Sequence, residues 1–388
     1  MQGFIYCLGI VAGFFVYRHL GLAKCNIGYM KRILRLLIIL PLLIWVACED
    51  EKSSNSDEDT LSDEDTLETA YEYELHSNNR VSSLLMSESE YDNWVSNDGF
   101  SNGGIRLPLI NDVYNKFSDK YDFIFFVLNE PSIPSSLFYY GKLIGVSNNV
   151  QGIGSNSYDY TSDYGSSGKL KAVMQLTGLE YLKYGPALHE LAHQWANYAL
   201  PTHSVDGVGS NLISYPYWGH WGYTGGSTPG QLGGFNQSSL IENGNNSYTV
   251  DSFGPFANGG NGVPFNELEL YLMGMLPISS VTPFDMFTDI TSLAIDTLTF
   301  DWTFTAARTT YTPQSLEDLL GERVPSEGNS QKDFNLLVIV ITDAPLSDDE
   351  WNKVDATAEW FSKKEDDGTS LYNFWEATNG VGSITIEN

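Results

Sequence analysis

Three residues near the middle of the chain, His189, Glu190 and His193, have the types and spacing needed to bind a metal ion and activate a water molecule. On an α-helix, side chains four residues apart project from the same face, so the two imidazoles can bind one ion together. The carboxylate of Glu190 lies beside them and can act as a general base toward water at that ion. Because the chain has only six histidines in 388 residues, we take this spacing as its main functional signal.

The residues around this triplet predict a helix over residues 186–199. Apolar side chains recur there at helical spacing, at Leu188, Leu191, Ala192, Trp195 and Ala199. Pro186 is tolerated at a helix start, and Pro201 ends the segment. The alternative is a buried helix that carries two hydrogen-bonded histidines and a solvated glutamate. Two histidines facing a core would be costly without a partner, so we favour the metal site.

The pattern H-E-x-x-H at residues 189–193 resembles the zinc-binding helix of the zincin metallopeptidase superfamily. The resemblance implies an α+β fold of the zincin-like type, with a mixed sheet, the H-E-x-x-H helix and two lobes around a cleft. It also implies one catalytic Zn²⁺ held by His189 and His193, with Glu190 as general base in the hydrolysis of protein or peptide substrates.

Two histidines do not complete a catalytic zinc site, which takes three protein ligands and leaves a position for water. The metzincin pattern requires Gly and His at positions 196 and 199, where this chain has alanines. The thermolysin-like pattern requires a nearby Glu, but no glutamate lies between Glu190 and Glu242. We expect His220, in an aromatic and Gly-rich turn, to be the third ligand, with Glu269 on a second helix as the alternative. Other residues stay open: His203, Asp206, Glu242 and Glu267 as ligands, and Tyr215, Tyr217, Tyr223 and Tyr271 as oxyanion stabilisers.

Apolar runs predict strands at residues 123–128, 139–146, 170–176 and 334–342. Helices are predicted at residues 87–94, 107–119, 265–274 and 348–363, and a hairpin at residues 243–250. In the zincin fold, the strand just before the metal helix borders the cleft and pairs with the substrate backbone. By this resemblance we assign residues 170–176 that role, with Val173 and Gln175 as the substrate-strand candidates. The alternative is an ordinary sheet strand.

The domain organisation follows from composition. No low-complexity linker interrupts residues 70–388, so we expect one catalytic domain with an N-terminal lobe of about residues 70–200 and a C-terminal lobe of about residues 201–388. The alternative is a separate C-terminal module. No segment has the D-x-D-x-D-G spacing of a calcium loop, so calcium has no support from the sequence.

The N-terminal part has the features of an export signal. Residues 30–47 have a basic start and a short apolar stretch, and they end at Cys48 in a context that resembles a bacterial lipobox. We therefore expect Cys48 to be lipidated, residues 1–29 to be an upstream extension, and the acidic residues 48–69 to be a disordered tether. This predicts an exported lipoprotein of the bacterial outer membrane or cell surface, similar to secreted lipoprotein metallopeptidases. The alternatives are a secreted chain or an N-terminal membrane anchor.

Charge and cysteine content exclude several classes of function. The net charge of −29 argues against nucleic acid as a partner, and membrane contact is expected through the lipid only. All three cysteines lie within the first 48 residues, so the domain has no thiol nucleophile and no cysteine metal site. We expect a monomeric, zinc-dependent endopeptidase. The alternatives are a non-catalytic surface protein that binds protein or glycan on a zincin scaffold, and a metal-dependent hydrolase of a non-peptide bond.

Overall fold

A computed structural model describes residues 69–200, 205–206, 213–214, 221, 225–251, 260–299 and 301–388. All of them belong to one compact unit, Glu64–Asn388. The predicted export signal, the lipidated Cys48 and nearly all of the acidic tether lie outside the described residues. Within the part that is described, no helix combines the length and apolar character needed to cross a bilayer.

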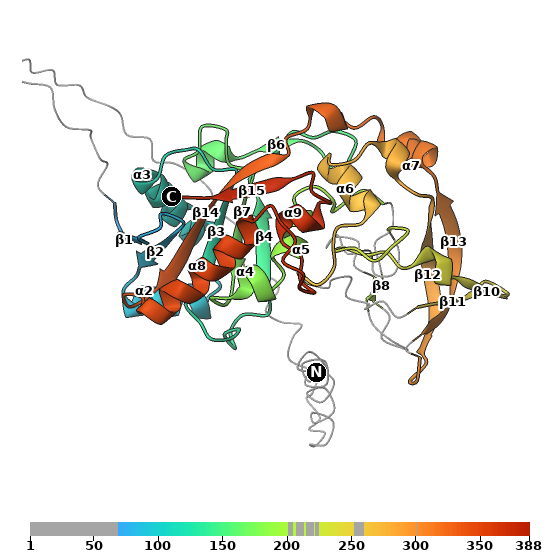
Figure 1. Cartoon of the computed structure of the whole chain (residues 1–388), viewed down its shortest axis with the longest axis horizontal. Coiled ribbons are helices and arrows are strands. Elements are labelled where there is room, and N and C mark those ends of the chain that lie inside the picture. The colour runs from blue at the N-terminus through green and yellow to red at the C-terminus, as the bar shows by residue number, and fades with distance from the viewer. Residues whose placement is uncertain are drawn as a thin grey trace, which may run out of the picture. The chain divides into compact units, whose positions relative to one another are not determined.

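The main sheet has seven strands in the order β1-β2-β14-β3-β7-β4, with β15 also paired to β14 (Figure 1). The strands are β1 (Glu72–Leu75), β2 (Val81–Leu85), β3 (Phe123–Leu128), β4 (Gly141–Gly145), β7 (Ala172–Leu176), β14 (Asp333–Thr342) and β15 (Ser383–Ile386). Strands β2, β14, β3 and β7 are parallel, whereas β1 and β4 are antiparallel to their neighbours. The chain is therefore an α+β protein with a mixed sheet, as the sequence predicts.

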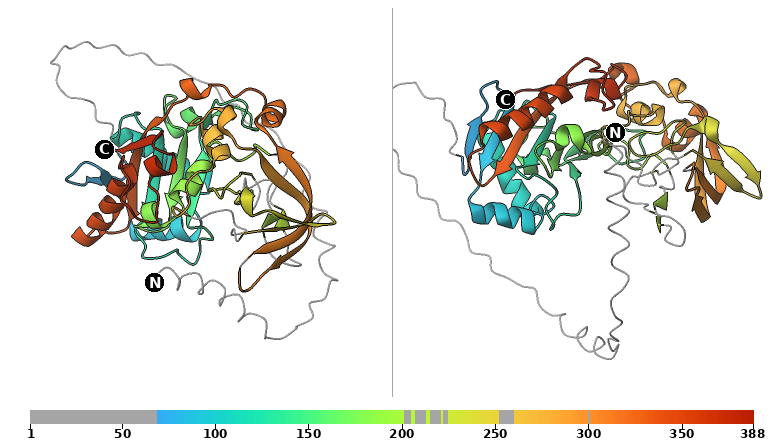
Figure 2. Two further views of the ribbon diagram at one scale, coloured as in Figure 1. Left: turned by 45° about the vertical axis from the view of Figure 1, so that its right-hand side comes forward. Right: turned by 60° about the horizontal axis from the view of Figure 1, so that its bottom comes forward.

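Helices cover both faces of this sheet because its central strands are apolar on both sides. All six residues of β3 are buried: Phe123, Phe125 and Val127 pack on one face, and Ile124, Phe126 and Leu128 pack on the other. Helix α8 (Asp348–Ser362) covers the first face, and α2 (Glu88–Ser96) and α3 (Gly103–Lys116) cover the second (Figure 2). Helix α2 begins at the capping box formed by Ser87 and Glu90, as expected from the sequence.

The position of strand β14 contradicts the predicted division into two lobes at residue 200. This C-terminal strand lies inside the main sheet, between β2 and β3, and α8 packs on the same sheet. The last third of the chain therefore completes the core that residues 70–200 begin. The prediction failed because pairing between strands about 200 residues apart leaves no local signal in the sequence.

A second sheet of four strands has the order β10-β11-β13-β12. Its strands are β10 (Ile241–Gly244), β11 (Ser247–Val250), β12 (Phe284–Ile295) and β13 (Trp302–Tyr311). Asn245 and Asn246 have positive φ angles of 52° and 58° and form the tight turn of the predicted hairpin, which is confirmed. This sheet has a small core of its own around Phe235, Phe287 and Phe304.

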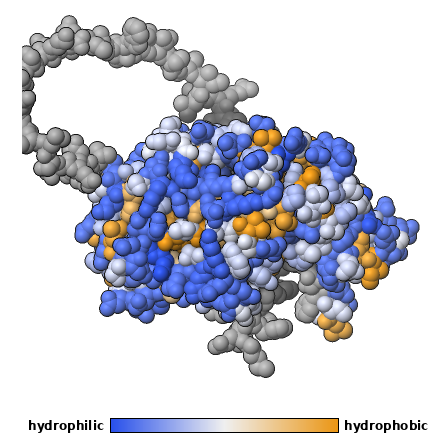
Figure 3. Space-filling view, turned by 45° about the horizontal axis from the view of Figure 1, so that its top comes forward, coloured by the Kyte–Doolittle hydropathy of each residue, from blue (hydrophilic) through white to orange (hydrophobic). Residues whose placement is uncertain are grey.

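The remaining elements lie in the segments between these strands. They are β5 (Ser147–Asn148), β6 (Tyr158–Asp159), β8 (Val205–Asp206), β9 (Ile213–Ser214), α4 (Tyr181–Tyr184), α5 (Ala187–Ala192), α6 (Glu267–Met273), α7 (Pro313–Leu320), α9 (Phe374–Ala377) and short 3-10 turns. In the face shown in Figure 3, hydrophilic residues cover most of the surface and hydrophobic residues form separate patches between them.

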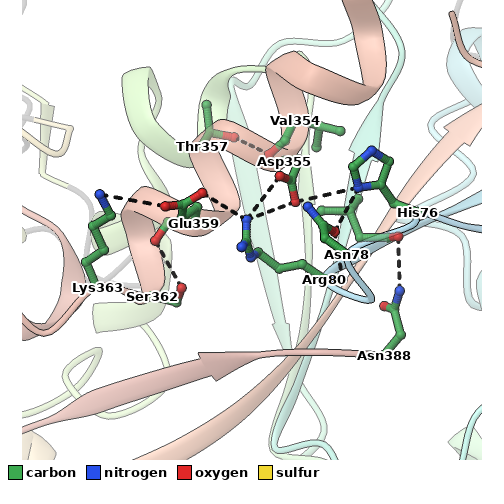
Figure 4. A network of polar contacts seen from close by, with 11 residues as sticks. His76, Asn78, Arg80, Val354, Asp355, Thr357, Glu359, Ser362, Lys363 and Asn388 are labelled. Atoms are coloured by element: carbon green, nitrogen blue, oxygen red, sulfur yellow. Dashed lines mark hydrogen bonds and ion pairs between the residues drawn. The ribbon is translucent and has the colours of Figure 1, made fainter. Parts of the chain in front are cut away.

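Charged contacts attach helix α8 to the turn between β1 and β2 (Figure 4). Nη1 of Arg80 donates to both carboxylate oxygens of Asp355, at 3.1 and 3.0 Å, and to Glu359 at 3.2 Å. The ring of His76 stacks on Trp351, with 5.2 Å between ring centroids. Because α8 packs on β14, these contacts also fix the central part of the sheet.

Candidate metal and catalytic site

Helix α5 carries the first two residues of the H-E-x-x-H triplet, and it is shorter than predicted. It spans Ala187–Ala192, and all six residues are buried. Beyond it, the N–H of His193 donates to the carbonyl of Glu190, and the N–H of Trp195 donates to that of Ala192, so the helix tightens into i to i+3 turns. His193 keeps helical angles, with φ −60° and ψ −21°, so its spacing to His189 is preserved although the helix does not continue to residue 199.

The two imidazoles face one another at a distance suited to a shared ion. Nε2 of His189 lies 3.2 Å from Nε2 of His193, and the ring planes are 87° apart. Two nitrogens of a tetrahedral zinc site, each about 2.0–2.1 Å from the ion, are separated by about 3.3 Å. The separation of the two nitrogens therefore fits two ligands of one zinc ion.

The other nitrogen of each ring is held by an oxygen acceptor. Nδ1 of His189 lies 2.8 Å from the backbone carbonyl of Gln231, and Nδ1 of His193 lies 2.6 Å from Oδ1 of Asn197. Both acceptors favour the tautomer with the proton on Nδ1, which places a lone pair on each Nε2. In that tautomer both Nε2 atoms can donate an electron pair to one cation. The donor set thus fits a metal ion.

The carboxylate of Glu190, the residue that follows His189, is buried and is held by strand β4. Its side chain is 9% exposed, and Oε2 accepts the N–H of Leu143 at 3.1 Å. Burial raises the pKa of Glu190 to about 7, against the opposing effects of the Leu143 N–H and of Lys142. A carboxyl group in such surroundings can exchange a proton near neutral pH.

Gly141 permits the close approach of α5 to β4. A Cβ atom at this position would lie 2.8 Å from Pro186 and 2.9 Å from Cγ of Glu190. Any larger residue would push the helix or the carboxylate away from the strand.

Strand β7 does not have the position that we assigned to it. It lies between β3 and β4 and pairs with both, so its backbone is not open to a substrate, and the roles predicted for Val173 and Gln175 are wrong. Val173 is buried in the core under α2 and α3. Gln175 accepts the indole N–H of Trp94 at 2.7 Å and donates to the hydroxyl of Tyr139 at 2.8 Å. Among the strands that the structure describes, β4 is the edge strand on this side of the sheet, although it precedes β7 in the chain.

Glu269, the alternative third ligand, lies in helix α6 and is fully buried. Its carboxylate accepts three backbone N–H groups, from Gln231 at 3.0 Å, Leu232 at 2.5 Å and Asn266 at 2.9 Å. Burial raises the pKa of Glu269 to about 7, although these hydrogen bonds act in the opposite direction. His220, the preferred third ligand, lies outside the described residues, as does His203.

Within the described residues, only Asp366, Asp367 and Glu376 form a group of three whose potential ligand atoms all lie within 4.8 Å. The structure therefore brings neither Glu269 nor Glu190 within this distance of both imidazoles, so neither is placed as a third ligand. The acidic group itself could hold a metal ion, but two of its members are exposed, and both accept backbone N–H groups of their own loop.

Sequence reasoning missed three contributors to the site: the Gln231 carbonyl, the Asn197 side chain and the Leu143 N–H. Asn197 could have been found, because it lies four residues after His193, on the same face of the helix that the sequence predicts. The other two act through backbone atoms, which the sequence does not mark.

Comparisons of the chain with protein-family models, with curated proteins and with solved structures found no match. Its function is therefore inferred from the residues and geometry of the site.

Proposed function

We propose that this protein is a zinc-dependent endopeptidase of zincin-like fold, exported and attached to the membrane by a lipid on Cys48. His189 and His193 supply two zinc ligands, His220 supplies the third, and Glu190 is the general base. The observation that carries the proposal is the pair of Nε2 atoms 3.2 Å apart, each on a ring whose Nδ1 is held by an oxygen acceptor, with the buried carboxylate of Glu190 on the same short helix as His189.

A zinc ion bound at these nitrogens supplies Lewis-acid chemistry, which polarises a carbonyl group and makes water more acidic. Glu190 accepts a proton from the attacking water and passes it to the leaving amine nitrogen. The N–H of Leu143 holds one oxygen of this carboxylate and so orients it for both transfers. The acceptors on His189 and His193 keep both rings in the tautomer that ligation requires.

The outer side of strand β4, which no other strand of the described residues pairs with, supports a peptide substrate. The N–H of Thr177 donates to the carbonyl of Tyr140, and the N–H of Val146 donates to that of Lys171, so residues 140, 142, 144 and 146 direct their backbone toward β7. Gly141, Leu143 and Gly145 consequently direct their N–H and C=O groups away from the sheet. An extended peptide can pair with this side by strand addition, which would place its backbone next to Glu190.

The test combines zinc content, by elemental analysis, with hydrolysis of a protein library monitored by mass spectrometry. We expect one zinc per chain in the wild type, loss of zinc and activity in His193→Ala, and zinc without activity in Glu190→Gln. His76→Ala is the matched control, because His76 stacks on Trp351 away from the triplet and should keep both. Absence of zinc in the reconstituted wild type, or activity in Glu190→Gln, would contradict the proposal. Zinc without any hydrolysis would favour a binding protein.

A further inference from the structure

We infer that the capping box of helix α6, formed by Asn266 and Glu269, is a positioning device that holds the backbone carbonyl of Gln231 against Nδ1 of His189. The inference rests on the proposed function, since it concerns the orientation of a zinc ligand. In this role Glu269 is not a ligand. It acts on the metal site through Gln231.

The carboxylate of Glu269 fixes two consecutive peptide groups: the one that ends at the N–H of Gln231, and the one that joins the Gln231 carbonyl to the N–H of Leu232. Its Oε2 accepts the N–H of Gln231, and its Oε1 accepts the N–H of Leu232, the residue whose amide shares a peptide plane with the Gln231 carbonyl. With both flanking N–H groups held by one fully buried carboxylate, the direction of the carbonyl is determined. That direction is toward His189, at 2.8 Å.

Asn266 closes the rest of the loop around the start of α6. Its side-chain N–H₂ group lies within hydrogen-bond distance of three loop carbonyls, those of Gly225 at 3.2 Å, Thr228 at 3.4 Å and Gly233 at 3.1 Å. Its Oδ1 accepts the N–H of Glu269 at 3.0 Å, which completes the helix cap. One residue therefore joins the helix cap to the loop that carries Gln231.

Glycines in the loop allow its backbone to pass close to the side chains of Asn266 and Glu269. A Cβ atom at Gly230 would lie 2.5 Å from the side chains of both Asn266 and Glu269, and one at Gly226 would lie 2.3 Å from Nδ2 of Asn266. The Gly-rich composition of residues 225–234 thus has a local cause, which is the approach of the backbone to two buried polar side chains.

The side chain of Gln231 adds a second restraint. It is fully buried, and its Nε2 donates to the carbonyl of Gly260 at 2.7 Å and to that of Val263. Backbone and side chain are both fixed, so the loop has little freedom to follow a displaced imidazole. We therefore expect a change at Glu269 to be transmitted to His189.

The test is the variant Glu269→Gln in the purified protein, with three measurements. An amide in place of the carboxylate turns one acceptor into a donor that faces a backbone N–H, which should release one end of the Gln231 peptide. We expect the zinc dissociation constant, measured by chelator competition, to rise about 10- to 100-fold, with one zinc per chain still bound at saturation. In the metal-free protein, ¹⁵N NMR should show His189 as the Nδ1–H tautomer in the wild type and as a mixture in the variant. Circular dichroism confirms folding.

Helix α9 offers a matched control. Its capping box has the same residue types, Asn373 and Glu376, and Asn373 is also fully buried. Because Glu376 belongs to the acidic group that could hold a metal ion, the glutamate control is Glu350→Gln, in the capping box of α8, which should leave the zinc dissociation constant and the His189 signal unchanged. If Glu269→Gln fails to fold, Asn266→Ser replaces it, because Ser still caps the helix but removes the N–H₂ group that contacts the loop. Asn373→Ser is its control.

Three results would overturn the inference. A zinc dissociation constant within twofold of wild type in the folded Glu269 or Asn266 variant would remove the positioning role. Complete loss of zinc from folded Glu269→Gln at saturation would make Glu269 a ligand. An unchanged His189 tautomer in the Glu269 or Asn266 variant would show that the capping box does not act on His189 through Gln231. Failure of the wild type to bind zinc would instead refute the proposed function, and the tautomer measurement would still decide the positioning role.

Discussion

Asn197 is the residue at which the proposed zinc site can be tested most directly through the hydrogen-bond partner of a proposed ligand. Its Oδ1 lies 2.6 Å from Nδ1 of His193 and is that nitrogen's hydrogen-bond acceptor. Asn197→Ala removes the acceptor and leaves the ring free to adopt either tautomer and to rotate. Outer-shell partners of this kind contribute a factor of about 10–100 to metal affinity.

The degree of burial decides where in this range the effect should fall. His189 is 3% exposed, whereas His193 and Asn197 are half-buried. Water can reach the vacated position and replace part of the lost hydrogen bond. We therefore expect the lower end, about a tenfold rise in the zinc dissociation constant, which is about 1.4 kcal/mol.

Chelator competition on the purified protein measures this change. Asn197→Asp is the informative partner variant, because a carboxylate acceptor increases the basicity of the imidazole and should make binding tighter than in wild type. Asn329→Ala, an exposed position, is the control and should have no effect. If Asn197→Ala binds zinc as tightly as wild type, the orientation of His193 does not depend on this contact, and the tautomer argument for the site fails.

Two further changes test the packing that supports the site. Gly141→Ala should destabilise the protein by about 1–3 kcal/mol in urea unfolding, because the added Cβ would lie 2.9 Å from Cγ of Glu190. It should also reduce peptide hydrolysis. Gly328 has open space around it, so Gly328→Ala should change neither stability nor hydrolysis. Arg80→Ala should cost about 1 kcal/mol by thermal unfolding, since it removes partly exposed contacts to Asp355 and Glu359, and it should leave zinc binding unchanged.

The sequence predicted well those elements whose signal is local. The apolar runs that form β3 and β14 were identified because strands covered on both faces have no polar residues to alternate with. The hairpin at residues 243–250 was marked by its Asn- and Gly-rich turn, and α2 by its capping box. Each of these features is decided by residues within a few positions of one another.

The spatial order of strands was not predictable in the same way. Strand β7 is the last strand before the H-E-x-x-H segment in the chain, but β4 occupies the edge on that side, so sequence order suggested the wrong strand. Helix α5 was predicted too long because the apolar spacing continues to Ala199, where the residues are buried in turns rather than in a helix. A buried helix and a buried series of turns both produce this apolar spacing, and only the backbone hydrogen bonds distinguish the two structures.

The contact between Glu190 and Leu143 couples the proposed general base to the edge strand where we propose that a substrate pairs. The N–H of Leu143 points away from β7, but it already donates a hydrogen bond to Oε2 of Glu190 at 3.1 Å. A peptide that pairs along β4 must therefore compete with the carboxylate for this donor or pair on either side of it.

Glu190→Ala frees the N–H, whereas Glu190→Gln keeps an amide oxygen that can accept it. Both variants lack a base, so we expect neither to hydrolyse peptide, but Glu190→Ala should bind an extended peptide more tightly than Glu190→Gln. Fluorescence anisotropy with a labelled peptide measures the difference, and equal affinities would show that substrate does not use this N–H of the edge strand.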